Sequence, residues 1–225
     1  MLHLKDCLTP NWSAPKNVIA VTTLKTTAAD FTHSLVSTPK WLKQMHGTHV
    51  VCADDEFVIR PEADASYARE KNSICVVSTA DCLPIVLCDK DGTQVAAMHA
   101  GWRGLAAGII KATTQKFSAP QNCLAWIGPA IGAQAFEVGK DVPDTFQANN
   151  WPAEILASAF PAKPNTPGKY LGDLCALARF ALQQQGILVA NIFGGEFCTY
   201  SDPERFHSYR RSGLKHGMST LIWLE

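Results

Sequence analysis

Short apolar runs rich in Val and Ile alternate with turn residues through the first half of the chain. Runs of this length and composition, bounded by Gly, Pro, Asn or Asp, are typical of β-strands. Five such runs occupy residues 18–22, 50–52, 73–78, 85–89 and 94–99. The Lys-Asp-Gly sequence at 90–92 favours a hairpin turn between the last two.

The hydrophobic period changes after His99. Apolar residues recur every three to four positions through 105–117, which predicts one amphipathic helix that follows Gly101 and covers a sheet. A second helix is expected at 173–185, ended by Gly186, and the Pro-rich segment 160–169 is expected to be a long surface loop. Four further strands are expected at 124–127, 135–138, 188–193 and 219–224.

These elements predict an α/β (α+β) fold with a mixed β-sheet. Strands and helices do not alternate regularly, which disfavours a Rossmann or TIM arrangement. The length of 225 residues fits one domain spanning residues 1–225.

Composition narrows the class of protein. The chain is 47% hydrophobic and 18% charged, enough for a sizeable core, and its formal net charge of +0 argues against a nucleic-acid-binding surface and against disorder. The first ten residues include Asp6 and Pro10, and no later run is apolar enough to span a membrane. We therefore expect a cytoplasmic protein whose eight cysteines stay reduced.

Two histidines three residues apart, His46 and His49, suggest a metal site. The Gly-Thr turn at 47–48 leads into a predicted strand, and on a strand residues i and i+3 face opposite sides. At most one of the two is therefore expected to be a ligand, and His46 in the turn is the better candidate.

Two further segments place reactive side chains at strand ends. Asp81 and Cys82 lie in a short link between two predicted strands, where active-site residues often occur. His99 ends a strand and is followed by a glycine-flanked turn, in which Arg103 offers donors suited to phosphate or carboxylate.

Together these segments offer His46, Cys82 and His99. Three N/S ligands without an obvious fourth are typical of a catalytic zinc site that keeps one position open. The same ligand set occurs in blue-copper centres when a weak axial Met joins, and Met45 and Met98 adjoin the two histidines. Ligand type alone leaves zinc and copper open.

Five motifs occur in order: Gln-Met-His-Gly at 44–47, Thr-Ala-Asp-Cys-Leu-Pro at 79–84, His-Ala-Gly-Trp-Arg-Gly at 99–104, Gly-Pro-Ala-Ile at 128–131 and Phe-His-Ser-Tyr-Arg-Arg at 206–211. In these motifs the chain resembles the YfiH/YlmD family, long labelled polyphenol oxidase or laccase-domain proteins and later purine nucleoside phosphorylases. The resemblance implies a single α-β-β-α layered domain with mixed sheets. It also implies that the zinc ligands are His46, Cys82 and His99.

The resemblance further implies phosphorolysis of adenosine, inosine and methylthioadenosine to a base and ribose 1-phosphate, with adenosine deamination as a side activity. The partners are then a small nucleoside and phosphate. We predict that Arg103, with Arg210 or Arg211, holds the phosphate, and that Gln44 binds substrate. Asp81 is predicted to handle the purine proton or to orient a metal ligand.

Three alternatives remain open. A four-copper laccase needs more imidazole ligands than seven histidines supply, whereas a single-copper polyphenol oxidase remains open. Cys82 can also act without metal as a nucleophile with His99 as base, in which case His46 is not required. The last alternative is a peptidoglycan-precursor editing factor, which predicts no nucleoside turnover.

One departure from the family pattern lies near the end of the chain. Relatives commonly carry a Gly-Arg pair after the Tyr-Arg-Arg motif, whereas residues 213–218 read Gly-Leu-Lys-His-Gly-Met. Lys215 and His216 are the nearby positive groups, and neither is assigned a role.

Overall fold

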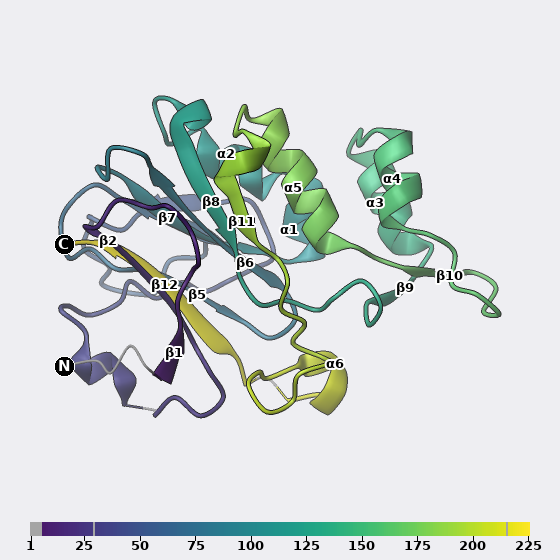
Figure 1. The fold of residues 1–225 in the computed structure, drawn as a ribbon, viewed down its shortest axis with the longest axis horizontal. Helices are drawn as coiled ribbons and strands as arrows, with labels where there is room; N and C mark the ends of the chain where they lie inside the picture. The colour runs from purple at the N-terminus through teal and green to yellow at the C-terminus, as the bar shows by residue number, and fades with distance from the viewer. Residues whose placement is uncertain (1–5, 29, 215) are drawn as a thin grey trace.

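Two β-sheets packed face to face form the centre of the computed structural model, which describes residues 6–28, 30–214 and 216–225 (Figure 1). The larger sheet has six strands in the order β11-β8-β6-β7-β4-β3 and is mixed, because its two outer pairs are parallel. Its strands are β3 (Val50–Cys52), β4 (Ala65–Ala68), β6 (Leu83–Asp89), β7 (Val95–Ala100), β8 (Cys123–Ile127) and β11 (Ile192–Gly194).

The smaller sheet is antiparallel throughout, in the order β1-β2-β12-β5. Its strands are β1 (Cys7–Leu8), β2 (Val18–Thr23), β5 (Cys75–Thr79) and β12 (Met218–Leu224). β12 is the last strand along the chain, yet it lies inside the sheet between β2 and β5. The predicted mixed α/β content is confirmed.

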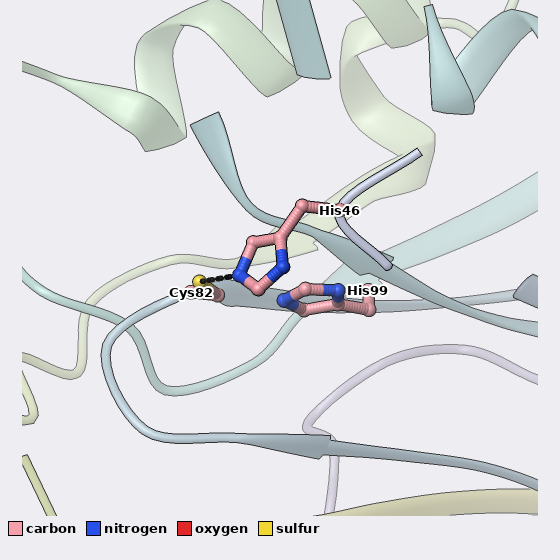
Figure 2. Close-up of side chains that lie close together, drawn as sticks. All are labelled: His46, Cys82 and His99. Atoms are coloured by element: carbon pink, nitrogen blue, oxygen red, sulfur yellow. Dashed lines mark hydrogen bonds between the residues drawn. The ribbon is translucent and has the colours of Figure 1, made fainter. Parts of the chain in front are cut away.

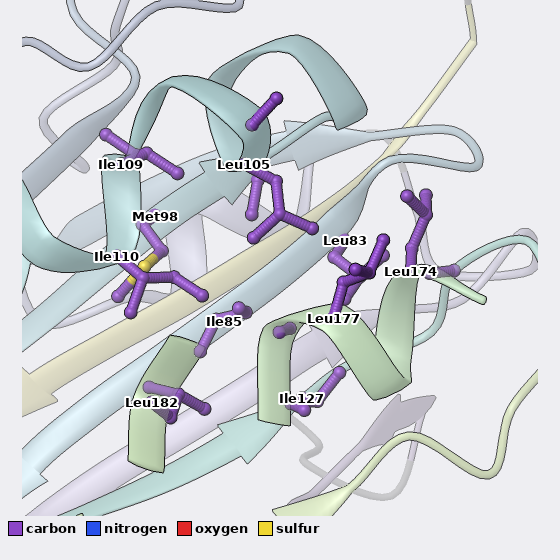
Figure 3. Packing of buried hydrophobic residues seen from close by; sticks show 14 of the residues in the cluster. Leu83, Ile85, Met98, Leu105, Ile109, Ile110, Ile127, Leu174, Leu177 and Leu182 are labelled. Carbon is purple, nitrogen blue, oxygen red and sulfur yellow. The ribbon is translucent and has the colours of Figure 1, made fainter. Parts of the chain in front are cut away.

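Side chains alternate between the faces of each strand, so every central strand contributes to two cores. On β7, Ala96 and Met98 face the helices, whereas Val95 and Ala97 face the smaller sheet. The helix-side core contains leucine and isoleucine side chains from β6, α1, α2 and α5 (Figure 3). The outer face of the smaller sheet packs against Phe31, Leu35 and Trp41, from a segment that includes the 3-10 helix η2 (Phe31–Ser34).

Six α-helices are present in the described residues. They are α1 (Trp102–Ala107), α2 (Ile109–Thr114), α3 (Asp141–Ala148), α4 (Ala153–Ala159), α5 (Leu174–Gln184) and α6 (Tyr209–Ser212). The first two and α5 cover the larger sheet, and α6 lies close to the start of β12 (Figure 1). Among the described helices, none has the length and apolar character that crossing a membrane requires.

The single helix expected after Gly101 is in fact two. Gly108 has φ +98° and ends α1, its N–H donating to the carbonyls of Gly104 and Leu105, and α2 begins at the next residue. Glycine adopts this left-handed backbone at no steric cost. The apolar spacing continues across the break, which is why the sequence pattern resembles one helix.

Other expected elements are present with shifted ends. The helix expected at 173–185 is α5, with the Asp173 carboxylate accepting the N–H of Ala176 at 2.8 Å, and Gly186 follows with φ +86°. The strand expected at 135–138 is β9 (Glu137–Gly139), which pairs with β10 (Lys169–Leu171). The strand expected at 188–193 is mostly the 3-10 helix η4 (Val189–Asn191), followed by β11.

Candidate functional site

Three side chains from separate segments, His46, Cys82 and His99, meet at one end of the space between the sheets (Figure 2). Their ligand atoms all lie within 4.8 Å of one another, and Cys82 Sγ is 4.0 Å from His46 Nε2. The rings of His46 and His99 are T-shaped, with centroids 4.7 Å apart. The structure thus brings together the three residues that the sequence offered as metal ligands.

Strand register explains why Cys82 and His99 meet. His99 lies on β7 on the same side as Val95 and Ala97, so its ring points into the space between the sheets. Pro84 of the neighbouring strand β6 is its register partner. Cys82 is two residues before Pro84 and lies diagonally across from His99.

His46 reaches the group from a tight turn with φ +59°. The Asp64 carboxylate holds this turn by accepting the backbone N–H groups of Met45 at 3.1 Å, His46 at 2.9 Å and Gly47 at 2.7 Å. His49 lies on the other side of the turn, where its Nδ1 is 2.7 Å from the Glu62 carbonyl oxygen.

Asp64 also contacts His99, and sequence reasoning missed it. Its Oδ1 lies 2.8 Å from Nδ1 of His99, and the two residues are only 1% and 2% exposed. A carboxylate behind a histidine orients the imidazole and directs its other nitrogen to the metal. The available signal was a single Asp between two small residues, Ala63 and Ala65, which are buried in the structure.

The electrostatics of this group are strongly coupled. Burial would raise the pKa of Asp64, but hydrogen bonds from His99 and from backbone N–H groups outweigh it and lower the pKa. Burial would lower the pKa of His99, yet Asp64 and Cys82 raise it to about 9. Burial would raise the pKa of Cys82, but His46 and His99 lower it to about 7. The thiol is therefore readily ionised, as a metal ligand or nucleophile requires.

Because Gly101 has no side chain, it provides the room in which His46, Cys82 and His99 meet. A Cβ at this position would lie 2.9 Å from Cδ2 of His46, 3.1 Å from Sγ of Cys82 and 3.3 Å from Nε2 of His99. Gly104 serves the packing of α1, since a Cβ there would lie 2.8 Å from the Gly47 carbonyl oxygen.

The donor set and its surroundings fit a metal ion. Two imidazoles and a low-pKa thiol suit zinc or copper, and the carboxylate of Asp64 supports His99 from behind. His46 is exposed, Cys82 half-buried and His99 buried, so the group is open on one side. Such an arrangement leaves room for a substrate beside the ion.

A cavity of about 180 Å³ lies on this open side. Besides the three ligand candidates, its lining comprises Gln44, Ser78, Thr79, Ala80, Tyr209, His216 and Gly217. The C-terminal segment before β12 therefore supplies one wall of the cavity. His216, from the segment that departs from the family pattern, is part of this wall, whereas Lys215 lies outside the described residues.

Gln44 lines the cavity, but its amide is occupied. Its Nε2 donates to the Ser78 carbonyl at 2.8 Å, and its Oε1 accepts the Ser78 N–H at 2.7 Å. This paired contact attaches the His46 turn to β5. A direct role of Gln44 in substrate binding stays a prediction.

Asp81 points away from the three ligand candidates. It is 9% exposed and has φ +86°, and its carboxylate accepts hydrogen bonds from Thr199 Oγ1 at 2.6 Å, Ser208 Oγ at 3.1 Å and Arg210 N at 2.7 Å. Asp81 thus anchors the C-terminal segment beside the cavity. The carboxylate that contacts a ligand candidate is Asp64, beside His99, and a proton-handling role of Asp81 stays a prediction.

The three arginines predicted to hold phosphate differ in their local contacts. Arg103 is exposed on α1, with its guanidinium stacked 4.2 Å from the Trp102 ring centroid. Arg210 Nη1 donates to the Glu137 carbonyl at 3.0 Å. Arg211 donates to three backbone carbonyls, including that of Thr199 at 2.6 Å. Arg210 and Arg211 thus hold the backbone, which sequence spacing could not reveal.

Comparison with known proteins places the chain in a family. The family model described as "Multi-copper polyphenol oxidoreductase laccase" matches residues 15–225. The chain is 42% identical to purine nucleoside phosphorylase PA4543 of Pseudomonas aeruginosa, covering 97% of this chain and 98% of that protein. It is 46% identical to purine nucleoside phosphorylase YfiH of Escherichia coli, covering 85% and 76%. The crystal structure of Neisseria meningitidis protein NMB0706 has a TM-score of 0.88 and 38% identity, covering 98% and 99% of the two chains.

Proposed function

The chain belongs to the YfiH/YlmD family, whose family model is described as multi-copper polyphenol oxidoreductase laccase, and from this premise we propose that it is a zinc-dependent purine nucleoside phosphorylase. Its substrates are adenosine, inosine and methylthioadenosine, and it deaminates adenosine as a side activity. The observation that supports this most is the open three-donor group of His46, Cys82 and His99 beside a cavity, in a chain whose relatives are named purine nucleoside phosphorylases.

A catalytic zinc ion suits this three-donor group better than a structural zinc ion does. Structural zinc sites are normally closed by four protein ligands, whereas catalytic sites keep one position open. When bound, the zinc ion supplies Lewis-acid chemistry: it lowers the pKa of a water molecule and polarises a substrate atom. His46, Cys82 and His99 would hold the ion, and Asp64 would fix the orientation of His99.

Arg103 is our candidate for the phosphate contact. It follows Gly101 by two residues, is exposed, and makes no hydrogen bond in the described part of the chain that would occupy its guanidinium. Arg210 and Arg211 have donors engaged by backbone carbonyls, so we propose that they shape the C-terminal wall of the cavity. We place the reaction in the cytoplasm, where Cys82 stays reduced.

A copper oxidase is the weaker alternative. Within the described ranges, one group of at least three His, Cys, Asp or Glu side chains has metal-binding spacing, and it contains two histidines. A three-copper cluster requires many more imidazoles in one place. A single-copper oxidase needs no such cluster and is tested by the experiment below.

A metal-free cysteine hydrolase is favoured by one observation. Cys82, His99 and Asp64 form a thiol–imidazole–carboxylate series, and the pKa of Cys82 is lowered to about 7. Cysteine hydrolases, and a factor that edits peptidoglycan precursors, can use such a series. His46 distinguishes the metal-free hypotheses from the zinc-dependent one, because a Cys–His pair does not need a second imidazole.

Metal analysis combined with product analysis tests the proposal. Protein purified without added metal should contain one zinc per chain, and incubation with adenosine and phosphate should release adenine, with inosine or hypoxanthine as deamination products. Copper in place of zinc with oxidation of phenols would support the oxidase. A metal-free protein that loses activity on alkylation of Cys82 would overturn the zinc proposal.

A further inference from the structure

Thr79 carries a buried hydroxyl group that has no partner among the described residues. The residue is 3% exposed, and its Oγ1 has no hydrogen bond there. Buried polar groups are normally hydrogen-bonded, because desolvation without a partner costs free energy. Thr79 also lines the cavity beside the three ligand candidates.

The direction of the Thr79 side chain follows from strand alternation. Cys75 and Val77 on β5 face the larger sheet and belong to the core between the sheets. Thr79, two residues further along the strand, faces the same side. His99 faces this space from the opposite sheet, so the Thr79 hydroxyl and the metal group share one end of it.

Tyr209 supplies an aromatic surface on the same cavity. It is 54% exposed, which is unusual for a large aromatic side chain, and it begins α6. Its position is held by its neighbours: Ser208 Oγ and Arg210 N both donate to the buried Asp81 carboxylate. An exposed ring on a fixed backbone is suited to stacking against a planar ligand.

We propose that Tyr209 and Thr79 recognise the base of the nucleoside, an inference that rests on the proposed phosphorylase function. The Tyr209 ring stacks on the purine, and the Thr79 hydroxyl forms a hydrogen bond with a polar atom at the purine edge. The cavity of about 180 Å³ is smaller than the roughly 300–1,000 Å³ of typical pockets for drug-sized ligands. It therefore suits the ring system, with the ribose directed outward to the phosphate.

Direct binding of inosine to zinc-loaded protein, measured by isothermal titration calorimetry without phosphate, tests this inference. Tyr209→Ala should weaken binding roughly tenfold or more, as expected for loss of one stacked base, and Tyr209→Phe should recover most of the affinity. Thr79→Val, which keeps the shape and removes the hydroxyl, should weaken binding about fivefold to tenfold, and Thr79→Ser should recover it.

Tyr200→Ala is the matched control. Tyr200 is also an exposed tyrosine, at 41%, but it lines a neighbouring cavity with Arg210 and Lys163 instead of the cavity beside the metal group. Its loss should leave inosine affinity unchanged. Zinc content and melting temperature should match the wild type in all variants, and Thr79→Val should be at least as stable because it removes an unpaired buried hydroxyl.

The outcomes separate the inference from the function on which it rests. Wild-type turnover of inosine with unchanged affinity in Tyr209→Ala and Thr79→Val would overturn the inference and leave the phosphorylase function intact. A zinc-loaded wild type that neither binds inosine nor releases hypoxanthine in the presence of phosphate would overturn both.

Discussion

Asp64 and His99 form a buried pair in which Oδ1 of the carboxylate lies 2.8 Å from Nδ1 of the imidazole. With Nδ1 directed at Asp64, Nε2 of His99 faces Cys82 and His46. The same carboxylate accepts three backbone N–H groups from the His46 turn. One side chain therefore sets the position of two of the three ligand candidates.

Replacing Asp64 by Asn should weaken zinc binding about tenfold to 100-fold, the range found for partners behind ligating histidines. The amide keeps the shape of the carboxylate but loses its charge and half of its acceptor capacity. Competition with a chromophoric zinc chelator measures the effect. Asp54→Asn is the control, since Asp54 accepts the backbone N–H groups of Arg69 and Glu70 elsewhere. Equal zinc affinity in the two variants would contradict this role of Asp64.

Gly101→Ala should abolish zinc binding while the fold is retained. The added methyl group would lie 2.9 Å from His46 and 3.1 Å from Cys82, where it separates the donors. Gly108→Ala is the opposite case, because nothing lies within 4 Å of a Cβ added there. The backbone φ of +98° should make the alanine variant about 1–2 kcal/mol less stable, without loss of zinc. Zinc analysis and thermal denaturation of both variants distinguish the two effects.

His46→Ala should lose zinc and activity together, with zinc affinity reduced by more than the 100-fold typical of indirect partners. His49→Ala should retain both, because the His49 ring contacts the Glu62 carbonyl outside the group. Metal content and adenosine turnover are the measurements. If His46→Ala kept full activity, the metal-free Cys82–His99 mechanism would be favoured.

Cys82 in zinc-free protein should react with iodoacetamide at a rate that rises between about pH 6 and 8 and then levels off. Only the thiolate reacts, and a pKa of about 7 makes the thiol about half ionised at pH 7. Cys75 and Cys123, whose pKa values burial raises to about 12, should stay unmodified over this range. Peptide mass spectrometry gives the site of labelling. Zinc should protect Cys82, and labelling unaffected by zinc would show that it is not a ligand.

The three ligand candidates could be predicted because each is a rare chemical group at the end of an apolar strand or in the turn or link beside one. Asp64 was missed because β4, which follows it, consists of Ala-Ser-Tyr-Ala and lacks the β-branched residues that mark strands. Without that strand, Asp64 had no predicted position in the fold. Its role depends on contacts 17 to 35 residues away in the chain.

The sequence patterns predicted neither α3 nor α4, and they did not indicate the backbone contacts of Arg210 and Arg211. α3 contains Pro143, which is tolerated only because it lies in the first turn. Arg210 and Arg211 carry the charge that phosphate recognition needs, and only the folded chain shows that backbone carbonyls engage their donors. The sequence shows which chemical groups a segment carries, whereas the tertiary structure decides which hydrogen-bond partners those groups engage.

β12 follows every other strand along the chain but occupies an interior position of the smaller sheet. During synthesis, β2 and β5 cannot be joined through β12 until this strand has left the ribosome. Until then the C-terminal wall of the cavity is absent and the Cys82 thiol is less protected. Completion of the cavity beside His46, Cys82 and His99 is therefore a late event in the folding of this protein.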